Sequence, residues 1–182
     1  MMRLMTMLIT LQCINGFTPP VKPSIESFVY NGDIAPLQYF DPLQITSNMN
    51  EKDIKYLREA ELHHSRIAMA SFLGLVVSDI VGNGPAINNL FQADPIEQFP
   101  FWFGVFCYEF SRMGVGWKNP FIQGNGLFKL EDEYQPGNIL KLPVSTLDVN
   151  ELNKEISNGR LAMLGAAGFI AQELVTQHKI LG

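Results

Sequence analysis

Residues 155–173 read EISNGRLAMLGAAGFIAQE, and the architecture expected for the chain follows from this stretch. It places a carboxylate, an amide and a guanidinium within six residues (Glu155, Asn158 and Arg160) and continues to residue 172 without another charge. A similar phrase, ELHHSRIAM, occupies residues 61–69, and equivalent positions are separated by a constant 94 residues, from 61 to 155 and from 66 to 160. Because an internal repeat constrains architecture directly, the sequence predicts two equivalent helices related by an approximate two-fold axis.

Each phrase continues as a helix of good helix formers without an internal proline. The charge-free segments, 67–78 and 161–172, have by themselves the length of a buried helix in a soluble protein. With the polar turn before each segment and the residues after it, both helices become long enough to cross a bilayer. The sequence therefore leaves both environments open at this point.

An ionised glutamate and arginine at membrane depth require a partner of opposite charge. Within one helix, residues five positions apart diverge by about 140°, so the Glu and Arg of a single phrase do not meet. Two crossing helices would instead pair Glu61 with Arg160 and Glu155 with Arg66. The repeat predicts this exchanged pairing without any further assumption.

His64 and Asn158 each follow the glutamate of their phrase by three residues and therefore share its helix face. One nitrogen or oxygen donor beside an apolar surface is too little for a metal that needs several protein ligands. It suits a metal already held by a macrocycle, and Mg²⁺ accepts hard donors of this type. Small residues that allow a helix or a flat ligand to approach the backbone lie nearby, and ordinary helix packing also explains them: Ala68, Ala70, Ser71 and Gly74 on one helix, and Ala162, Gly165, Ala166, Ala167, Gly168 and Ala171 on the other.

These motifs resemble those of the three-helix chlorophyll-binding light-harvesting antenna superfamily, and more narrowly its fucoxanthin-type chlorophyll a/c branch. The resemblance covers about residues 28–180 and includes Tyr39-Phe-Asp41-Pro42-Leu43 and Tyr134-x-Pro136-Gly137-Asn138. It implies an all-α membrane protein with three transmembrane helices, the first and third crossing as a pseudo-two-fold pair.

The resemblance also implies pigment-binding residues. The side chains axial to chlorophyll magnesium would be Glu61, His64, Glu109, Glu155, Asn158 and Gln172, and Arg66, Arg112 and Arg160 would complete the pigment sites. Glu109 and Arg112 also have the spacing of a plain salt bridge within one helix. Phe101 stands where green-lineage relatives have a ligating glutamine, which puts one pigment site of that pattern in doubt.

The implied cofactors are chlorophyll a, chlorophyll c and a fucoxanthin-type carotenoid. The implied function is light harvesting, with transfer of excitation energy to a photosystem, and not enzymatic catalysis. The implied location is the plastid thylakoid membrane, crossed several times, and the implied partners are a photosystem core, neighbouring antenna subunits and thylakoid lipids. A photoprotective, energy-quenching relative of the same fold is the alternative, with luminal acidic residues as pH sensors: Asp79, Asp94, Glu97 and Glu173.

The chain divides into three parts. Residues 1–16 have a basic start, an apolar run and a small residue, as in a signal peptide. Together with the following Phe17 they resemble a plastid-targeting signal. The alternative is that they form a helical or disordered N-terminus of the mature protein. Residues 17–50 are expected to form an extended N-terminal loop, and 51–182 the three-helix domain. Within that domain we expect helices at about 51–80, about 97–115 and from Asp148 onward, where Asp148 and Glu151 have capping-box spacing. We expect a turn-rich luminal linker at 82–97 and a stromal loop at 116–146.

Other functions fit poorly. The net charge of −5 and the lack of a basic cluster argue against nucleic acid, and two cysteines provide neither a disulfide framework nor a zinc spacing. A di-iron carboxylate site needs two Glu-x-x-His motifs, but the second copy has Asn158.

Overall fold

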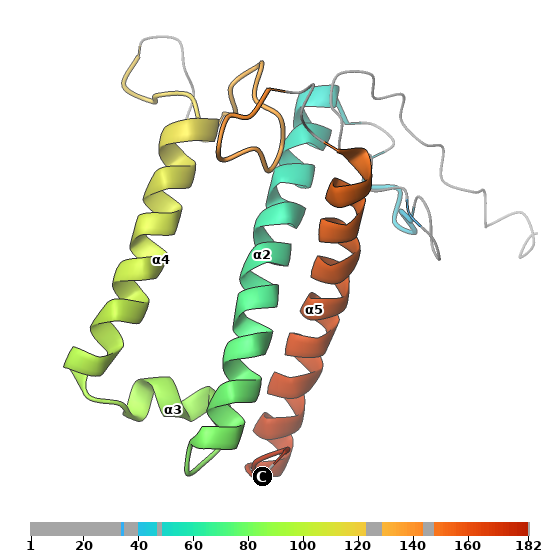
Figure 1. The fold of residues 1–182 in the computed structure, drawn as a ribbon. Coiled ribbons are helices and arrows are strands. Elements are labelled where there is room, and N and C mark those ends of the chain that lie inside the picture. Colours follow the sequence, from blue (N-terminus) through green and yellow to red (C-terminus); the bar gives the residue numbers. More distant parts are fainter. Residues whose placement is uncertain (1–33, 35–39, 47–48, 123–128, 144–147, 182) are drawn as a thin grey trace, which may run out of the picture.

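The computed structural model describes most of the chain beyond its N-terminal segment: residues 34, 40–46, 49–122, 129–143 and 148–181. The targeting segment expected at 1–16 and most of the loop expected at 17–50 lie outside the described residues. Helices dominate the described part of the chain (Figure 1): α2 (Glu51–Val81), α3 (Ala86–Gln92), α4 (Pro95–Gly116) and α5 (Val149–Thr176).

Helices α2 and α5 lie side by side along their length (Figure 1). With 31 and 28 residues they are about 46 and 42 Å long. Acidic residues occupy the first turn of α2, where they complement the helix dipole. The side chain of Asp148 caps α5 by accepting a hydrogen bond from the Asn150 N–H at 2.9 Å. The predicted helix at 51–80 and the predicted start at Asp148 are therefore confirmed.

The tightest contact between α2 and α5 joins equivalent positions of the repeat. Leu62 and its counterpart Ile156 are both fully buried. One turn further, Gly159 packs against its counterpart Ser65; a Cβ on Gly159 would lie 2.6 Å from Ser65 Oγ and closer still to Ser65 Cβ. Only glycine allows this approach, and the contact joins equivalent positions of the repeat.

The repeat also organises the opposite end of the pair. The Glu173 carboxylate on α5 accepts the first two N–H groups of α3 at 2.7 and 3.0 Å. Its counterpart Asp79 on α2 accepts the N–H groups of residues 180 and 181, at 3.2 and 2.7 Å. Both carboxylates are completely buried. The turn-rich linker predicted at 82–97 was wrong in missing α3. The first N–H groups of this seven-residue helix are bound by a carboxylate that is distant in sequence.

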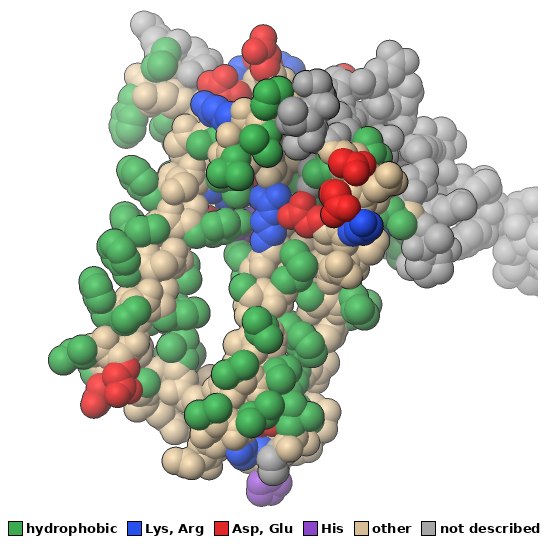
Figure 2. All heavy atoms as spheres, viewed as in Figure 1, with side chains coloured by type: hydrophobic (Ala, Val, Ile, Leu, Met, Phe, Trp, Pro, Cys, Tyr) green, Lys and Arg blue, Asp and Glu red, His purple; other side chains and the backbone are tan. Residues whose placement is uncertain are grey.

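Helix α4 stands apart from the α2–α5 pair (Figure 1), and its bounds agree with the helix predicted at about 97–115. Pro95 at its first turn needs no backbone hydrogen bond there. The space-filling view in Figure 2 shows an opening between α4 and the pair, lined by hydrophobic side chains. Large apolar side chains are exposed on α4: Phe99, Phe101, Trp102, Phe103, Val105, Phe106, Phe110 and Met113.

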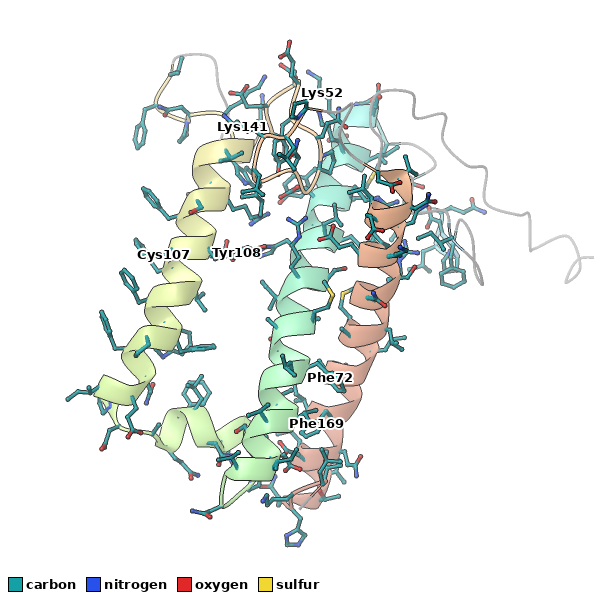
Figure 3. All side chains as sticks on the ribbon, in the orientation of Figure 1. Lys52, Phe72, Cys107, Tyr108, Lys141 and Phe169 are labelled. Atoms are coloured by element: carbon teal, nitrogen blue, oxygen red, sulfur yellow. The ribbon has the colours of Figure 1, made fainter. Side chains whose placement is uncertain are left out.

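Exposed apolar area of this extent indicates contact with lipid or with bound molecules. Of the described helices, α2 is long and apolar enough to cross a membrane by length and composition alone. Within the α2–α5 pair, Phe72 and Phe169 meet edge to face with ring centroids 6.4 Å apart (Figure 3). Few other large side chains are buried, so the described chain does not enclose a large core of its own.

The loop after α4 folds back onto α2. A backbone bridge joins Trp117 to Leu130, and the Asp132 carboxylate contacts Lys52 at 2.9 Å and Lys118 at 2.5 Å. The hydrogen bonds and positive charges of these two lysines lower the pKa of Asp132 to about 2, and Lys118 has the larger effect. Tyr134 is buried against Gly116, where a Cβ would meet its ring at 2.9 Å.

Candidate functional site

Two ion pairs connect α2 and α5 in the exchanged arrangement predicted from the repeat. Arg66 Nε lies 2.6 Å from Glu155 Oε1, and Arg160 Nε lies 2.8 Å from Glu61 Oε1. The predicted pairing is thus confirmed. The side chains of Arg66 and Glu155 are 24% and 25% exposed, so each charge is largely removed from solvent and depends on its partner.

The two pairs differ in one respect that the repeat does not predict. Glu61 also binds Arg58 on its own helix through its second oxygen, so both of its oxygens already hold guanidinium groups. A carboxylate has about four lone-pair positions, and Glu61 therefore keeps acceptor capacity for a further ligand. The repeat places Leu152 on α5 at the position equivalent to Arg58.

His64 and Asn158 lie at equivalent positions on the outer surface of the pair, one residue before the crossing contact. Both side chains are exposed, as is that of Gln172 further along α5. None of the three forms a side-chain hydrogen bond to another described residue. Their donor atoms are thus accessible next to apolar helix surfaces, as an axial ligand must be, and their ligand roles remain predictions.

The predicted pair on α4 belongs to a larger network. Arg112 Nη1 lies 3.4 Å from Glu109 Oε2, and Arg112 Nε lies 3.1 Å from Glu59 Oε1 on α2. Glu109 Oε1 lies 3.2 Å from Nε2 of His63. Both readings of the Glu109–Arg112 spacing therefore stay open: the salt bridge exists, and the role of Glu109 as a magnesium ligand stays a prediction.

Glu59 is a buried, hydrogen-bonded carboxylate next to the candidate site that the sequence analysis missed. It is 3% exposed and accepts hydrogen bonds from the Tyr134 hydroxyl at 3.3 Å and the Gly137 N–H at 2.7 Å, besides the contact with Arg112. Burial and the adjacent Glu59 charge raise the pKa of Tyr134, so its hydroxyl remains a donor. The repeat gave no sign of this residue because its counterpart, Asn153, is not acidic; its i, i+4 spacing to His63 was the available signal.

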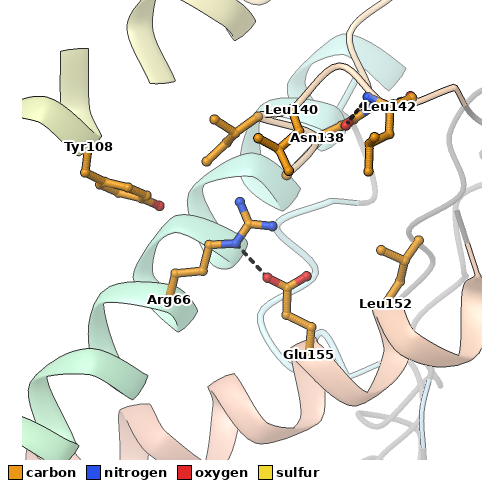
Figure 4. A pocket seen from close by; sticks show the side chains of 9 residues that line it. Arg66, Tyr108, Asn138, Leu140, Leu142, Leu152 and Glu155 are labelled. Atoms are coloured by element: carbon orange, nitrogen blue, oxygen red, sulfur yellow. Dashed lines mark hydrogen bonds and ion pairs between the residues drawn. The ribbon is translucent and has the colours of Figure 1, made fainter. Parts of the chain in front are cut away.

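A pocket of about 440 Å³ opens beside the Arg66–Glu155 pair (Figure 4). Its walls come from α2, α4, α5 and the loop over residues 137–142. Apart from the ion pair and Tyr108, the lining is mostly aliphatic: Ile139, Leu140, Leu142 and Leu152, with Gly137 and Asn138. A site with this composition suits a largely apolar ligand that carries a few polar atoms.

The proposed pH-sensing carboxylates are of two kinds. Asp79 and Glu173 are buried and hold backbone N–H groups, as described above. Asp94 and Glu97 are exposed at the first turn of α4. Only the second kind is in direct contact with solvent.

Comparison with known proteins gives a family. A family model described as "Chlorophyll A-B binding protein" matches residues 29–174. The light-harvesting complex stress-related protein 3.2 of Chlamydomonas reinhardtii is 35% identical over 82% of this chain and 64% of its own length. The fucoxanthin-chlorophyll a-c binding protein of Isochrysis galbana is 36% identical over 87% of this chain and 85% of its own. The photosystem I chlorophyll a/b-binding protein 5 of Arabidopsis thaliana is 29% identical over 88% and 69%. The chain spans slightly less than two thirds of the stress-related protein.

Proposed function

Because the chain belongs to the chlorophyll a-b binding protein family, we propose that it is a light-harvesting antenna that binds chlorophylls and carotenoids and passes excitation energy to a photosystem. The observation that carries this proposal is the pair of exchanged ion pairs, with His64 and Asn158 exposed beside them at equivalent positions. Bound chlorophylls would absorb the light. The protein would space, orient and tune them, and no bond is made or broken.

The proposed axial ligands are His64, Asn158 and Gln172, together with the carboxylates Glu61 and Glu155. The accessible donor atoms and the apolar surface around them fit a magnesium macrocycle that needs a single protein ligand. The arginines of the ion pairs would neutralise the carboxylates without removing all of their acceptor positions. Glu109 is proposed as a further ligand on α4, with Arg112 as its partner.

The proposed pigments are chlorophyll a, chlorophyll c and a fucoxanthin-type carotenoid. The similarity to the fucoxanthin-chlorophyll a-c protein supports the last two. The open, apolar-lined space between α4 and the α2–α5 pair supports the presence of bound molecules between the helices (Figure 2). Pigments there would cover apolar side chains that the protein itself leaves exposed.

We place α2, α4 and α5 across the plastid thylakoid membrane, with the ion pairs and the loop 116–146 toward the stroma. Lys118, Lys129 and Lys141 lie in this loop, whereas 82–97 has no Lys or Arg, in agreement with the positive-inside bias. Photosystem cores, other antenna subunits and thylakoid lipids are the proposed partners. Proteinase K added to intact thylakoids should cut within 116–146 and spare 82–97; cleavage confined to 82–97 would reverse this topology.

A second candidate function is photoprotection, favoured by the similarity to the stress-related proteins. The same helices would then quench excitation when the lumen is acidic. Fluorescence lifetime of the purified protein as a function of pH separates the two functions. A lifetime that stays constant between neutral and acidic pH supports harvesting, and one that shortens at acidic pH supports quenching.

The proposal is tested by pigment analysis of the purified protein. Wild-type protein should carry chlorophyll, and His64→Leu should lose about one chlorophyll while the fold persists. His178→Leu is the matched control, because His178 is exposed beyond the end of α5 and is not among the proposed ligands. An unchanged pigment content in His64→Leu would remove His64 from the ligand set, and a wild-type protein without pigment would refute the function.

A further inference from the structure

Tyr108 carries a hydroxyl that points into the protein, whereas the phenylalanines of α4 face outward. Phe99, Phe103, Phe106 and Phe110 on the same helix are exposed, whereas Tyr108 is partly buried and points from α4 toward α2 (Figure 3). Its hydroxyl oxygen is fully buried and has no hydrogen-bond partner among the described residues. Since buried polar atoms are normally paired, this hydroxyl calls for an explanation.

Stacking on a neighbouring ring fixes the orientation of the Tyr108 side chain. The ring stacks on His63 with centroids 5.9 Å apart and an interplanar angle of 8°. His63 is itself held by Glu109, at 3.2 Å. The hydroxyl is thus positioned by residues of both α2 and α4, and its direction is a property of the folded protein.

Tyr108 is one of the residues that line the pocket beside the Arg66–Glu155 pair, and its hydroxyl end points toward Arg66 (Figure 4). Arg66 offers only donors, so it cannot accept the phenolic hydrogen. Arg66 lies 2.6 Å from Glu155 Oε1, while no hydrogen bond links Glu155 to Tyr108. The remaining walls are mostly aliphatic. The described residues around the pocket therefore supply no acceptor for the phenolic hydrogen, and a ligand that reaches this hydroxyl would supply one.

We propose that Tyr108 donates a hydrogen bond to a peripheral carbonyl of the chlorophyll held next to Glu155, and so fixes the orientation of that chlorophyll and tunes its absorption. This inference rests on the proposed function. A chlorophyll combines an apolar body with carbonyl groups that only accept hydrogen bonds, which is the chemistry that the pocket would recognise. Tyr108 is a positioning residue here, because Glu155 supplies the metal ligand.

The test is the carbonyl region of the resonance Raman spectrum of the purified pigment–protein. Tyr108→Phe removes one oxygen atom and leaves the stacking on His63. We expect it to retain the wild-type chlorophyll content, while one carbonyl band moves from the hydrogen-bonded to the free position. Glu155→Leu removes the proposed metal ligand and should lower the chlorophyll content and delete that same band. Tyr56→Phe is the matched control, because Tyr56 is exposed on α2, and it should leave every carbonyl band in place.

Three results would overturn the inference. Carbonyl bands unchanged in Tyr108→Phe would show that no pigment accepts this hydroxyl, while the proposed function would stand. Failure of Tyr108→Phe to assemble would assign the hydroxyl to stability of the protein. A wild-type protein without chlorophyll would remove the proposed function together with the inference.

Discussion

The Arg66–Glu155 pair gives the sharpest test of the repeat-based architecture. Arg66→Leu removes the guanidinium and leaves the carboxylate of Glu155 between two helices without its main partner. This pair is a better target than Glu61–Arg160, because Glu61 also binds Arg58. Exchanging charges at Glu61 would place a new arginine against Arg58.

The expected magnitude follows from burial. Removing one partner of a buried ion pair costs about 3–5 kcal/mol because the other charge stays desolvated, whereas an exposed pair contributes at most about 1 kcal/mol. Arg66 and Glu155 are only about a quarter exposed, so we expect a loss of about 3 kcal/mol for Arg66→Leu. For a chain of this size that loss corresponds to a Tm lower by roughly 6–12 °C.

The assay is pigment reconstitution followed by thermal denaturation, monitored by chlorophyll circular dichroism. Lys154→Leu is the control, because Lys154 and Glu151 form a pair on α5 that is 66% and 67% exposed, and it should change Tm little. The double variant Arg66→Glu with Glu155→Arg should recover part of the loss, and the full cycle isolates the pair from other contacts. The reasoning fails if Arg66→Leu is no less stable than Lys154→Leu, or if the exchange gives no recovery.

Three further outcomes are expected. Gly159→Ala should destabilise the helix pair by about 1–3 kcal/mol, because the added methyl group would overlap Ser65. Gly168 has open space around it, so Gly168→Ala should be near neutral. Equal Tm values for the two variants would contradict the contact between Gly159 and Ser65. Glu173→Ala should leave two N–H groups of α3 unpaired at about 1–3 kcal/mol each, seen as faster hydrogen exchange in α3; exchange as slow as in wild type would disprove the contact. Because the folded-state pKa of Asp132 is about 2, below its unfolded value of about 4, the attachment of its loop to α2 should be constant above pH 4 and weaken as the pH falls toward 2. In Asp132→Asn the loop should be weakly attached to α2 at every pH. The rate of proteolysis of the loop measures its attachment in the wild type and in this variant.

The sequence predicted those parts of the site that the repeat copies. Two phrases at a fixed offset require equivalent helices, and equivalent helices that cross bring Glu61 to Arg160 and Arg66 to Glu155. Helix α5 was also predictable at its start, because Asp148 caps it locally.

The parts that the sequence did not predict depend on residues that have no equivalent in the other copy of the repeat. Glu59 has no acidic counterpart, and its partners come from α4 and from a loop more than seventy residues away. The first N–H group of helix α3 is bound by Glu173, a residue from the other end of the chain. The engagement of His63 with Glu109 follows from the placement of α4 next to α2, and no periodicity within either helix indicates it.

The two buried carboxylates at the far end of the α2–α5 pair have a consequence for biosynthesis. Each carboxylate binds the segment that follows the other helix. Glu173 accepts hydrogen bonds from the start of α3, which follows α2, and Asp79 accepts them from residues 180 and 181, which follow α5. Ala86 leaves the ribosome 87 residues before its acceptor Glu173. The carboxylate that accepts the first N–H groups of α3 therefore becomes available only after the second half of the chain has been made.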